Sequence, residues 1–366
     1  MNTSLLISNV APEDAGDSPA GRIEKIATQK TLLREHGWEQ IIGKITRGRY
    51  LPQGIAHCLR LGYKHSVDVV HSISEPIHLH IAGFVVSRVL GVPWVAHARD
   101  SMVVNKPGVT PGSTDERLRE VVEGFVARFA DRVLWDENGA MIPEGYFERT
   151  YPEVNQSKFV QLPSIGFVAE KFDGVAPATY EEQTITFAGS FYAGWGEPFE
   201  FFDGLQRYLA REDAESVTFH VYGEWGETYQ EACEARGIED HVVPHGWVPH
   251  EELVPPLKGS DILLHIGGRD PQHSAGIGTK VYDYIGAQRP ILVLGDPSFR
   301  VATVVESNDL GVVVPGDDPE EVATAIDHLL TEFEFDPDSS VRQEFSREHR
   351  IEALAHELDE AVANAT

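Results

Sequence analysis

The chain has 366 residues, of which 42% are hydrophobic and 24% are charged. This composition builds packed cores and excludes a disordered or fibrous chain, and the length favours two domains. The net charge of −28 argues against a general nucleic-acid binder, because neutralising phosphates requires a dense basic face. Few of the bases are lysines, and so acidic a composition fits a halophilic protein that stays dissolved in concentrated salt.

We expect no signal peptide or membrane-spanning segment in this sequence. No apolar run reaches the roughly 18 residues that span a bilayer, and the first residues lack the basic region of a signal peptide. Cys58 and Cys233 stand far apart without a CxxC partner, so no disulfide framework is expected. We therefore expect a cytoplasmic protein.

Strand and helix patterns alternate along the first part of the chain, which favours parallel βαβ units. Apolar runs typical of strands occur at 4–10, 67–71, 93–98 and 132–135, and helical patterns at 22–36, 76–90 and 117–130.

The second part repeats this alternation. Strands are predicted at 184–188, 217–222, 241–243, 262–265, 290–294 and 311–314, and helices at 198–210, 228–236, 280–286 and 319–330. The last helix, over 346–363, is amphipathic, with Ile351, Leu354, Leu358 and Val362 on one face.

Composition and charge place the domain boundary near the middle of the chain. Residues 162–182 combine Pro, Gly and polar residues without clear periodicity, and we place the hinge there. The net charge is −1 over residues 1–150 and −27 over 151–366, which supports two domains with different surfaces. We predict domains over 1–165 and 166–345, and a final segment, 346–366, whose helix packs back on the first domain.

The segment 260–292 carries the strongest functional signal. A strand ends, a loop with several glycines follows, and a helix begins near Thr279. The N-terminus of a helix attracts anions, and glycine lets a phosphate approach the backbone. Lys280, in the first turn, opposes the helix dipole and is therefore unexpected in a purely structural helix. The pattern predicts a phosphate site; a tight turn with a surface lysine is the other interpretation.

This segment resembles the donor-binding region of GT-B glycosyltransferases of the family 4 type. That family carries two glutamates separated by seven residues, with Gly-x-Gly just after the first. Gly276-Ile277-Gly278 matches the Gly-x-Gly, and Asp283 falls at the second acid, whereas Ala275 replaces the first. Lys280 and Tyr284 match divergent branches of the family that carry Lys-x-x-x-Tyr.

The resemblance implies an α/β fold of the GT-B type, with two Rossmann-like parallel-sheet domains facing a central cleft. The first would bind the acceptor and the second the donor. It also implies an activity of the hexosyltransferase type, which moves a sugar from a nucleotide-diphosphate sugar to a hydroxyl of a glycan or a lipid-linked acceptor. Configuration would be retained, and no metal or other cofactor would be needed. The sequence itself contains no HExxH motif or His cluster, so no metal site is expected.

The resemblance assigns residues of the second domain to the donor. Phosphate binding falls to Gly189, Ser190, Arg269, Gly276, Ile277, Gly278, Thr279 and Lys280, with Lys280 also catalytic. Ribose and base binding fall to Asp283, Gly223, Trp247 and Val248. The family usually places an arginine shortly after the loop at Gly189. Here Gly194-Trp195-Gly196 stands instead, so Arg269 or Lys280 is expected to compensate.

In the first domain, the resemblance assigns a loop with Gly16, Gly21 and Arg22 to the donor phosphates or the acceptor. It also makes His71, His97 and Asp100, which end or follow predicted strands, candidate catalytic residues. A histidine after a strand is more often a hydrogen-bonded edge residue than a catalyst, so both interpretations stay open.

A basic stretch in the first domain is a signal independent of any family. Residues 40–67 contain no Asp or Glu. They include five bases beside several apolar residues: Lys44, Arg47, Arg49, Arg60 and Lys64. Basic and apolar residues together favour peripheral contact with an anionic membrane, here at its inner face. The alternative is a solvent-exposed loop whose bases balance the charge of acidic residues in the other domain.

Two other functions remain compatible with the sequence. A nucleotide-sugar epimerase shares the fold, and a non-catalytic sugar-nucleotide-binding or scaffold protein would explain the loss of groups that the family uses. A dehydrogenase is disfavoured, because the chain lacks the dinucleotide-binding G-x-G-x-x-G.

Overall fold

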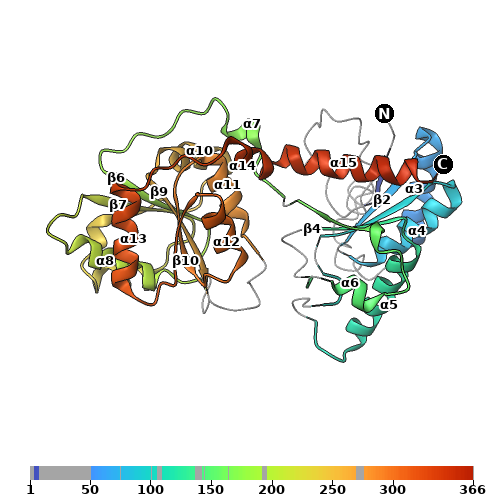
Figure 1. The fold of residues 1–366 in the computed structure, drawn as a ribbon, viewed down its shortest axis with the longest axis horizontal. Helices are drawn as coiled ribbons and strands as arrows, with labels where there is room; N and C mark the ends of the chain where they lie inside the picture. Colours follow the sequence, from blue (N-terminus) through green and yellow to red (C-terminus); the bar gives the residue numbers. More distant parts are fainter. Residues whose placement is uncertain are drawn as a thin grey trace. The chain divides into compact units, whose positions relative to one another are not determined.

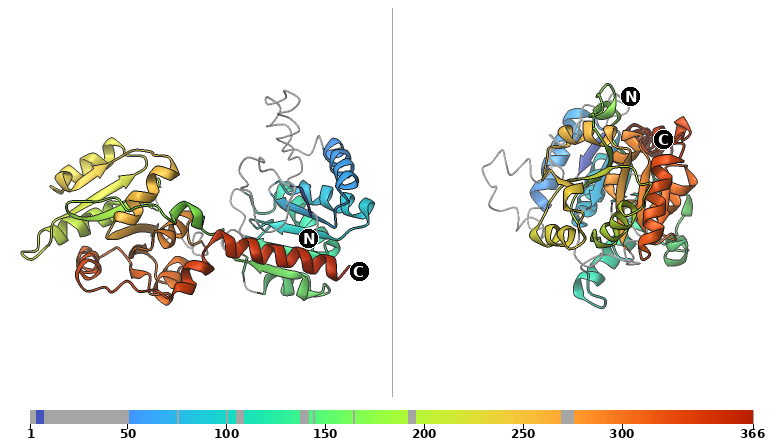
Figure 2. Two further views of the ribbon diagram at one scale, coloured as in Figure 1. Left: turned by 90° about the horizontal axis from the view of Figure 1, so that it is seen from above. Right: turned by 90° about the vertical axis from the view of Figure 1, so that its left-hand side faces the viewer.

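The structure is a computed structural model (Figures 1 and 2) that divides into two compact units, each described here by itself. It describes residues 4–7, 51–74, 76–99, 101–104, 109–136, 142–143, 145–163, 165–191, 196–268 and 276–365. Unit 1 comprises Met1–Ser164 and Arg350–Thr366, and unit 2 comprises Ile165–His349. Within the described part of the chain, no helix is long and apolar enough to cross a bilayer.

Unit 1 is built on a five-stranded sheet in the order β1-β2-β3-β4-β5, in which every neighbouring pair is parallel. Its strands are β1 (Ser4–Ile7), β2 (Val69–Ser74), β3 (Trp94–Ala98), β4 (Arg132–Asp136) and β5 (Phe159–Leu162). Its helices are α3 (Leu51–His65), α4 (His78–Leu90), α5 (Thr114–Phe129), α6 (Tyr146–Thr150) and most of α15 (Arg347–Ala363), with a 3₁₀ turn, η3 (Gln156–Lys158).

Alternate side chains of this sheet fill two separate cores, as the pleat of a strand requires. Val70 and Trp94 pack on the side of α3, α4 and α5, together with Val126. Val69 and Val95 pack on the other face, against Leu358 of α15. The predicted apolar stripe of the last helix therefore covers one face of this sheet.

Helix α3 and strand β5 are absent from the sequence predictions. Helix α3 contains Gly54, Gly62 and a proline, residues with poor helix propensity. Tertiary packing overrides that propensity: Gly62 is buried, and a Cβ there would collide with Leu90 at the end of α4. Helices α3 and α4 can approach closely because Gly62 has no side chain.

Unit 2 is built on a six-stranded parallel sheet in the order β11-β10-β9-β6-β7-β8. Its strands are β6 (Gln183–Ala188), β7 (Val217–Tyr222), β8 (Val242–Pro244), β9 (Ile262–Gly268), β10 (Ile291–Gly295) and β11 (Gly311–Val314). The two parallel sheets confirm the predicted α/β class. The chain extends the sheet from β6 to β8 on one side, then returns to place β9 on the other side of β6. The strand order therefore reverses between β6 and β9, and we call this place the switch point.

Helices cover both faces of this sheet. They are α7 (Ala169–Phe172), α8 (Phe199–Leu209), α9 (Glu227–Glu234), α10 (His250–Gly259), α11 (Thr279–Ala287), α12 (Arg300–Ser307), α13 (Pro319–Thr331) and α14 (Ser339–Glu344), with a 3₁₀ turn, η4 (Glu239–His241). Helix α10 was not predicted, because Pro255 and Pro256 lie inside it and proline usually ends a helix.

The predicted hinge region belongs for the most part to unit 2. The boundary between the units falls after Ser164, at the start of the segment 162–182. Beyond it, Phe167 and Phe172 are buried in the core of unit 2. The Lys258 amine donates hydrogen bonds of 2.9 and 2.6 Å to the carbonyls of Phe172 and Val175. The segment shows no hydrophobic periodicity because individual side-chain and backbone contacts fix it in place, rather than a regular helix or strand.

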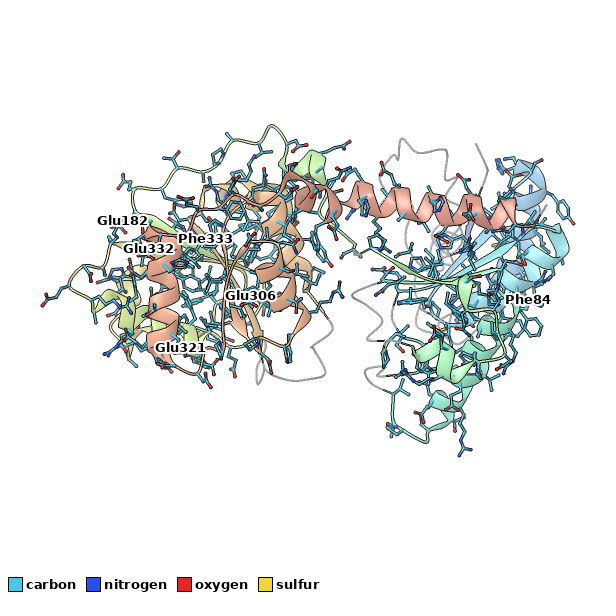
Figure 3. The ribbon with its side chains drawn as sticks, in the orientation of Figure 1. Phe84, Glu182, Glu306, Glu321, Glu332 and Phe333 are labelled. Atoms are coloured by element: carbon cyan, nitrogen blue, oxygen red, sulfur yellow. The ribbon has the colours of Figure 1, made fainter. Side chains whose placement is uncertain are left out.

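We expect unit 2 to be stabilised by salt. Exposed acids such as Glu182, Glu306, Glu321 and Glu332 are spread over its surface (Figure 3). Their mutual repulsion is screened as the Debye length falls from about 10 Å at 0.1 M to about 3 Å at 1 M salt. The melting temperature should rise by several degrees between these KCl concentrations. Sucrose at equal osmolality is the control, and an equal rise in sucrose would contradict the electrostatic explanation.

Candidate functional site

Tyr284 of α11 spans the switch point beneath the ends of two strands. Strand β6 pairs with β9 only through Ile185 and Thr186, so the strands separate before they end. The buried Tyr284 hydroxyl accepts a hydrogen bond from the Ala188 amide (3.1 Å) and donates one to the Leu264 carbonyl (3.0 Å). Burial raises the pKa of this hydroxyl, so it remains a donor at any ordinary pH. The tyrosine thus fixes α11 against both strands.

Lys280 lies one turn before Tyr284 on the same face of α11. Its Nζ lies 3.9 Å from the centroid of the Phe187 ring on β6. A Cβ at Gly189, where φ is +123°, would stand 3.2 Å from Nζ, so the amine lies close to bare backbone. The side chain is half-buried, and the loss of water around the amine lowers the pKa of Lys280 from 10.5 to about 7.

The residues 276–278, here called the glycine turn, lead into α11. Gly278 is the N-cap residue, with φ at +81°, and as a glycine it has no side chain that could cap the helix. The Val281 N–H bonds to the Gly278 carbonyl (3.2 Å), whereas the N–H groups of Thr279 and Lys280 have no acceptor among the described residues and can bind an anion. The side chain of Ile277 is buried in the core, so any contact it makes to a ligand is through its backbone. Thr279 is exposed.

His265 of β9 lies directly under the glycine turn. A Cβ at Gly278 would approach its Cε1 to 3.0 Å. The imidazole is 7% exposed, and its Nδ1 has no hydrogen-bond partner among the described residues. Burial, and then the charge of Lys280, lower the pKa of His265 to about 3, so the ring is neutral. The sequence predictions did not name His265; its only signal is a polar residue within an apolar strand.

The loops after β6 and β7 pack closely on one another. The Gly189 amide donates a 2.8 Å hydrogen bond to the Tyr222 carbonyl, and a Cβ at Gly223 would collide with the Gly189 carbonyl. Gly223 therefore has a packing role, beside the expected one in base binding. Ser190, next to Gly189, is half-buried.

The expected ribose and base residues come from α11 and from the loop between β8 and α10. Asp283 Oδ2 lies 3.1 Å from His250 Nε2 at the start of α10. Just before α10, Trp247 is 80% exposed and Val248 is half-buried. This contact brings Asp283 close to the loop that carries the two base candidates.

In unit 1, the structure brings His71 and His97 together. Their buried rings stack at 5.4 Å, and burial lowers the pKa of both. His97 Nε2 lies 2.6 Å from Asp136, whose carboxylate also accepts a 2.7 Å hydrogen bond from Arg350 of α15. Burial alone would raise the pKa of Asp136, but these two partners hold it below its ordinary value. Asp136 and Arg350 were not predicted from the sequence.

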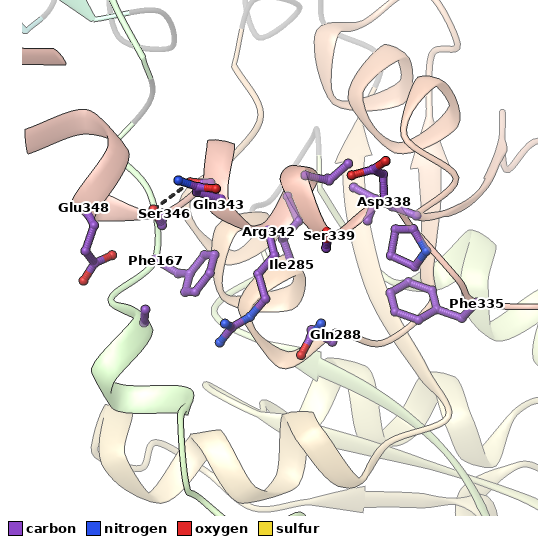
Figure 4. A pocket seen from close by; sticks show the side chains of 14 residues that line it. Phe167, Ile285, Gln288, Phe335, Asp338, Ser339, Arg342, Gln343, Ser346 and Glu348 are labelled. Atoms are coloured by element: carbon purple, nitrogen blue, oxygen red, sulfur yellow. Dashed lines mark hydrogen bonds between the residues drawn. The ribbon is translucent and has the colours of Figure 1, made fainter. Parts of the chain in front are cut away.

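Several predicted site residues lie outside the described part of the chain: Gly16, Gly21, Arg22, Lys44, Arg47, Arg49, Asp100 and Arg269. Among the described residues, no three His, Cys, Asp or Glu side chains gather in a way that could hold a metal ion. A cavity of about 380 Å³ lies near the C-terminal end of α11, with Gln288, Phe335 and Arg342 in its wall (Figure 4). Because the glycine turn is at the opposite end of α11, this cavity is not part of the candidate site.

Two parallel sheets of this kind, with a glycine turn at a switch point, define a GT-B fold, and solved structures agree. Anabaena Alr3699/HepE in complex with UDP is 14% identical, covers 98% of this chain and 100% of its own, and has a TM-score of 0.61. The lipopolysaccharide outer core galactosyltransferase WaaB is 12% identical over 100% of both chains, with a TM-score of 0.57. A glycosyltransferase from Rickettsia africae is 12% identical, covers 85% and 79%, and has a TM-score of 0.54.

Residues 182–332, most of unit 2, match the family described as glycosyl transferases group 1. Unit 2 therefore carries a group 1 glycosyltransferase domain, within a chain of GT-B fold. No curated protein matches the sequence of the chain.

Replacing Tyr284 by Phe should destabilise unit 2 strongly. The variant leaves the Ala188 amide and the Leu264 carbonyl without the buried hydroxyl that joins them. We expect the free energy of unfolding to fall by about 2 kcal/mol, measured by urea denaturation. Tyr63→Phe removes an exposed hydroxyl with a long 3.4 Å contact and should change stability little. Equal effects of the two substitutions would show that Tyr284 does not hold the switch point.

Proposed function

We propose that the chain transfers a sugar from a nucleotide-diphosphate sugar to a hydroxyl acceptor, with retention of configuration and without a metal ion. The observation that carries this proposal is the Lys280 amine, which lies at the uncapped N-terminus of α11 and against the bare backbone of Gly189. No carboxylate among the described residues pairs with it. An amine without an acidic partner, beside free helix N–H groups, suits a diphosphate.

The group 1 domain in unit 2 supports a nucleotide-sugar donor. Among proteins of the same fold, HepE binds UDP, which makes a nucleoside diphosphate a reasonable probe for this chain. In the proposal, Asp283 accepts hydrogen bonds from the ribose hydroxyls while His250 orients its carboxylate. Trp247, largely exposed, offers a face on which a base can stack.

The proposed reaction depends on the negative charge that develops on the leaving group. As the bond between the anomeric carbon and the phosphate oxygen breaks, negative charge develops on the leaving diphosphate. The Lys280 ammonium and the first N–H groups of α11 stabilise that charge. The acceptor oxygen forms the new bond to the anomeric carbon, and its proton passes to the leaving phosphate. A retaining transfer of this kind needs no strong general base, which agrees with His71 and His97 of unit 1, because burial lowers the pKa of both and makes them weak bases. In this proposal, those histidines contact the acceptor.

Incubating the protein with labelled nucleotide sugars and a lipid extract tests the proposal. We expect free nucleoside diphosphate to form only when acceptor is present, and EDTA to leave the rate unchanged. Lys280→Ala should lower the rate at least about 100-fold while the melting curve stays close to that of the wild type. Isomerised nucleotide sugar without transfer would favour an epimerase, and binding without turnover would favour a non-catalytic protein. A wild-type rate in Lys280→Ala would end the assignment of that residue.

We further propose that one face of unit 1 makes peripheral contact with an anionic membrane. Helices α3 and α4 contain no acidic residue, although the chain has 58 acids. Arg60, Tyr63 and Lys64 are exposed on α3, and a contact from Tyr63 to the Val89 carbonyl joins them to the exposed end of α4. Bases that flank exposed apolar groups match anionic lipid headgroups, at about 1 kcal/mol for each base near the surface.

Reversing the charge of Arg60 and Lys64 together, each to Glu, should weaken binding to vesicles of phosphatidylglycerol and phosphatidylcholine by at least about tenfold at 0.1 M salt. Flotation of the vesicles measures the bound fraction. The matched control reverses Arg117 and Arg149, two exposed bases of unit 1 on α5 and α6. If both double variants lose binding equally, the attraction comes from net charge and not from α3. If the wild type does not bind, the proposed contact is wrong.

A further inference from the structure

The Lys280 amine has no acidic partner among the described residues of unit 2. Strand β6 faces it with the Phe187 ring and the backbone of Gly189. Strand β9 faces it with the neutral imidazole of His265, whose pKa responds to the lysine charge. On α11 itself, the Tyr284 hydroxyl is already bonded to two strands, and Asp283 pairs with His250. In the described ranges, then, no acidic side chain forms an ion pair with the amine.

An ammonium in this position is poorly solvated and has no counter-charge from any residue that the structure describes. Burial without an anion favours the neutral form of a lysine, and a buried unpaired charge is strongly destabilising. An aromatic face offsets only part of the loss. This is the physical reason that the pKa of Lys280 lies at about 7. A large share of the amine is therefore unprotonated around neutral pH when no anion is bound.

A diphosphate would reverse this balance. Two negative phosphates beside the amine supply the counter-charge that the surrounding residues lack, and they favour the ammonium form. We propose that the diphosphate of the donor binds together with a proton, which Lys280 takes up from solvent as the anion arrives. One N–H bond forms on the amine, and the same proton returns to solvent when the diphosphate product leaves. The inference rests on the proposed function, because it concerns the same anion site.

The proton linkage fixes the direction of the pH dependence. The anion binds the ammonium form, so Lys280 adds no pH dependence to the affinity where it is already protonated, below about pH 7. Above that pH the ammonium form becomes scarce, and the dissociation constant should rise by up to about tenfold per pH unit. The rise ends at the higher pKa of the amine in the complex. A permanently charged guanidinium in place of the amine would remove this dependence.

Calorimetric titration with UDP, GDP and ADP tests the inference. At pH 8 a terminal phosphate, with a pKa of about 6, is already ionised and takes up no proton itself. Titrations in two buffers of different ionisation enthalpy give the number of protons bound with the nucleotide. We expect nearly one proton per site for the wild type at pH 8 and a much smaller number at pH 6.5.

Lys280→Arg is the decisive variant, because its side chain stays charged throughout this range. It should bind the nucleotide with no proton uptake and with an affinity that does not fall between pH 7 and 8. Lys280→Met should bind at least tenfold more weakly than the wild type at pH 6.5. The melting temperature of each variant, measured in the same buffers, checks that it is folded.

The outcomes separate this inference from the proposed function. If none of the three nucleotides binds the folded wild type at either pH, the proposed donor site is wrong, and the inference with it. If a nucleotide binds without proton uptake at pH 8, the inference alone is overturned. The same holds if Lys280→Arg takes up as many protons as the wild type, because another group would then be the one that titrates.

Discussion

The hydrogen bonds of the Tyr284 hydroxyl are the interaction on which the candidate site depends. At the switch point, β6 and β9 stop pairing and their polar backbone groups need other partners. The tyrosine supplies one acceptor and one donor, to Ala188 and Leu264. Because it comes from α11, the same contact fixes the helix whose first turn carries Lys280. A residue that satisfies the sheet thus also sets the position of the amine against Phe187.

Close backbone approach is the second constraint on this place. Gly189 lies against the lysine amine, Gly223 against the Gly189 carbonyl, and Gly278 against His265. Gly189 and Gly278 also take positive φ values that other residues rarely adopt. The glycines therefore do more than leave room for a ligand: three loops pack together only because these side chains are missing. A larger residue at Gly223 would disturb the site without touching the donor.

The sequence predicts those parts of the structure that depend on neighbouring residues. Strands β7 and β11 begin and end where the apolar runs do, and the glycine turn, Lys280 and Tyr284 lie within one short segment. Helices α3 and α10 were not predicted, because glycine and proline have poor helix propensity. Packing against α4 stabilises α3, and packing within unit 2 stabilises α10.

Contacts between distant residues also escape prediction. Asp136 meets His97 and Arg350 across 39 and 214 positions of the chain. The local sequence around each of these residues gives no sign of the other two. His265 is another case, because only the fold brings it under Gly278. For such residues, the polar side chain inside an apolar strand is the single clue that the sequence offers.

The proposed binding of an anion by a strongly acidic unit poses an electrostatic problem. Residues 151–366 carry a net charge of −27, which repels a diphosphate at long range. Salt at 1 M shortens the Debye length to about 3 Å and removes most of this repulsion, whereas direct contacts survive. The anion site then needs only local positive groups without acidic neighbours. Lys280 meets that condition: its described neighbours are an aromatic ring, a neutral imidazole and bare backbone. In the proposed function, surface charge thus serves solubility in salt, while the half-buried amine of Lys280 serves binding.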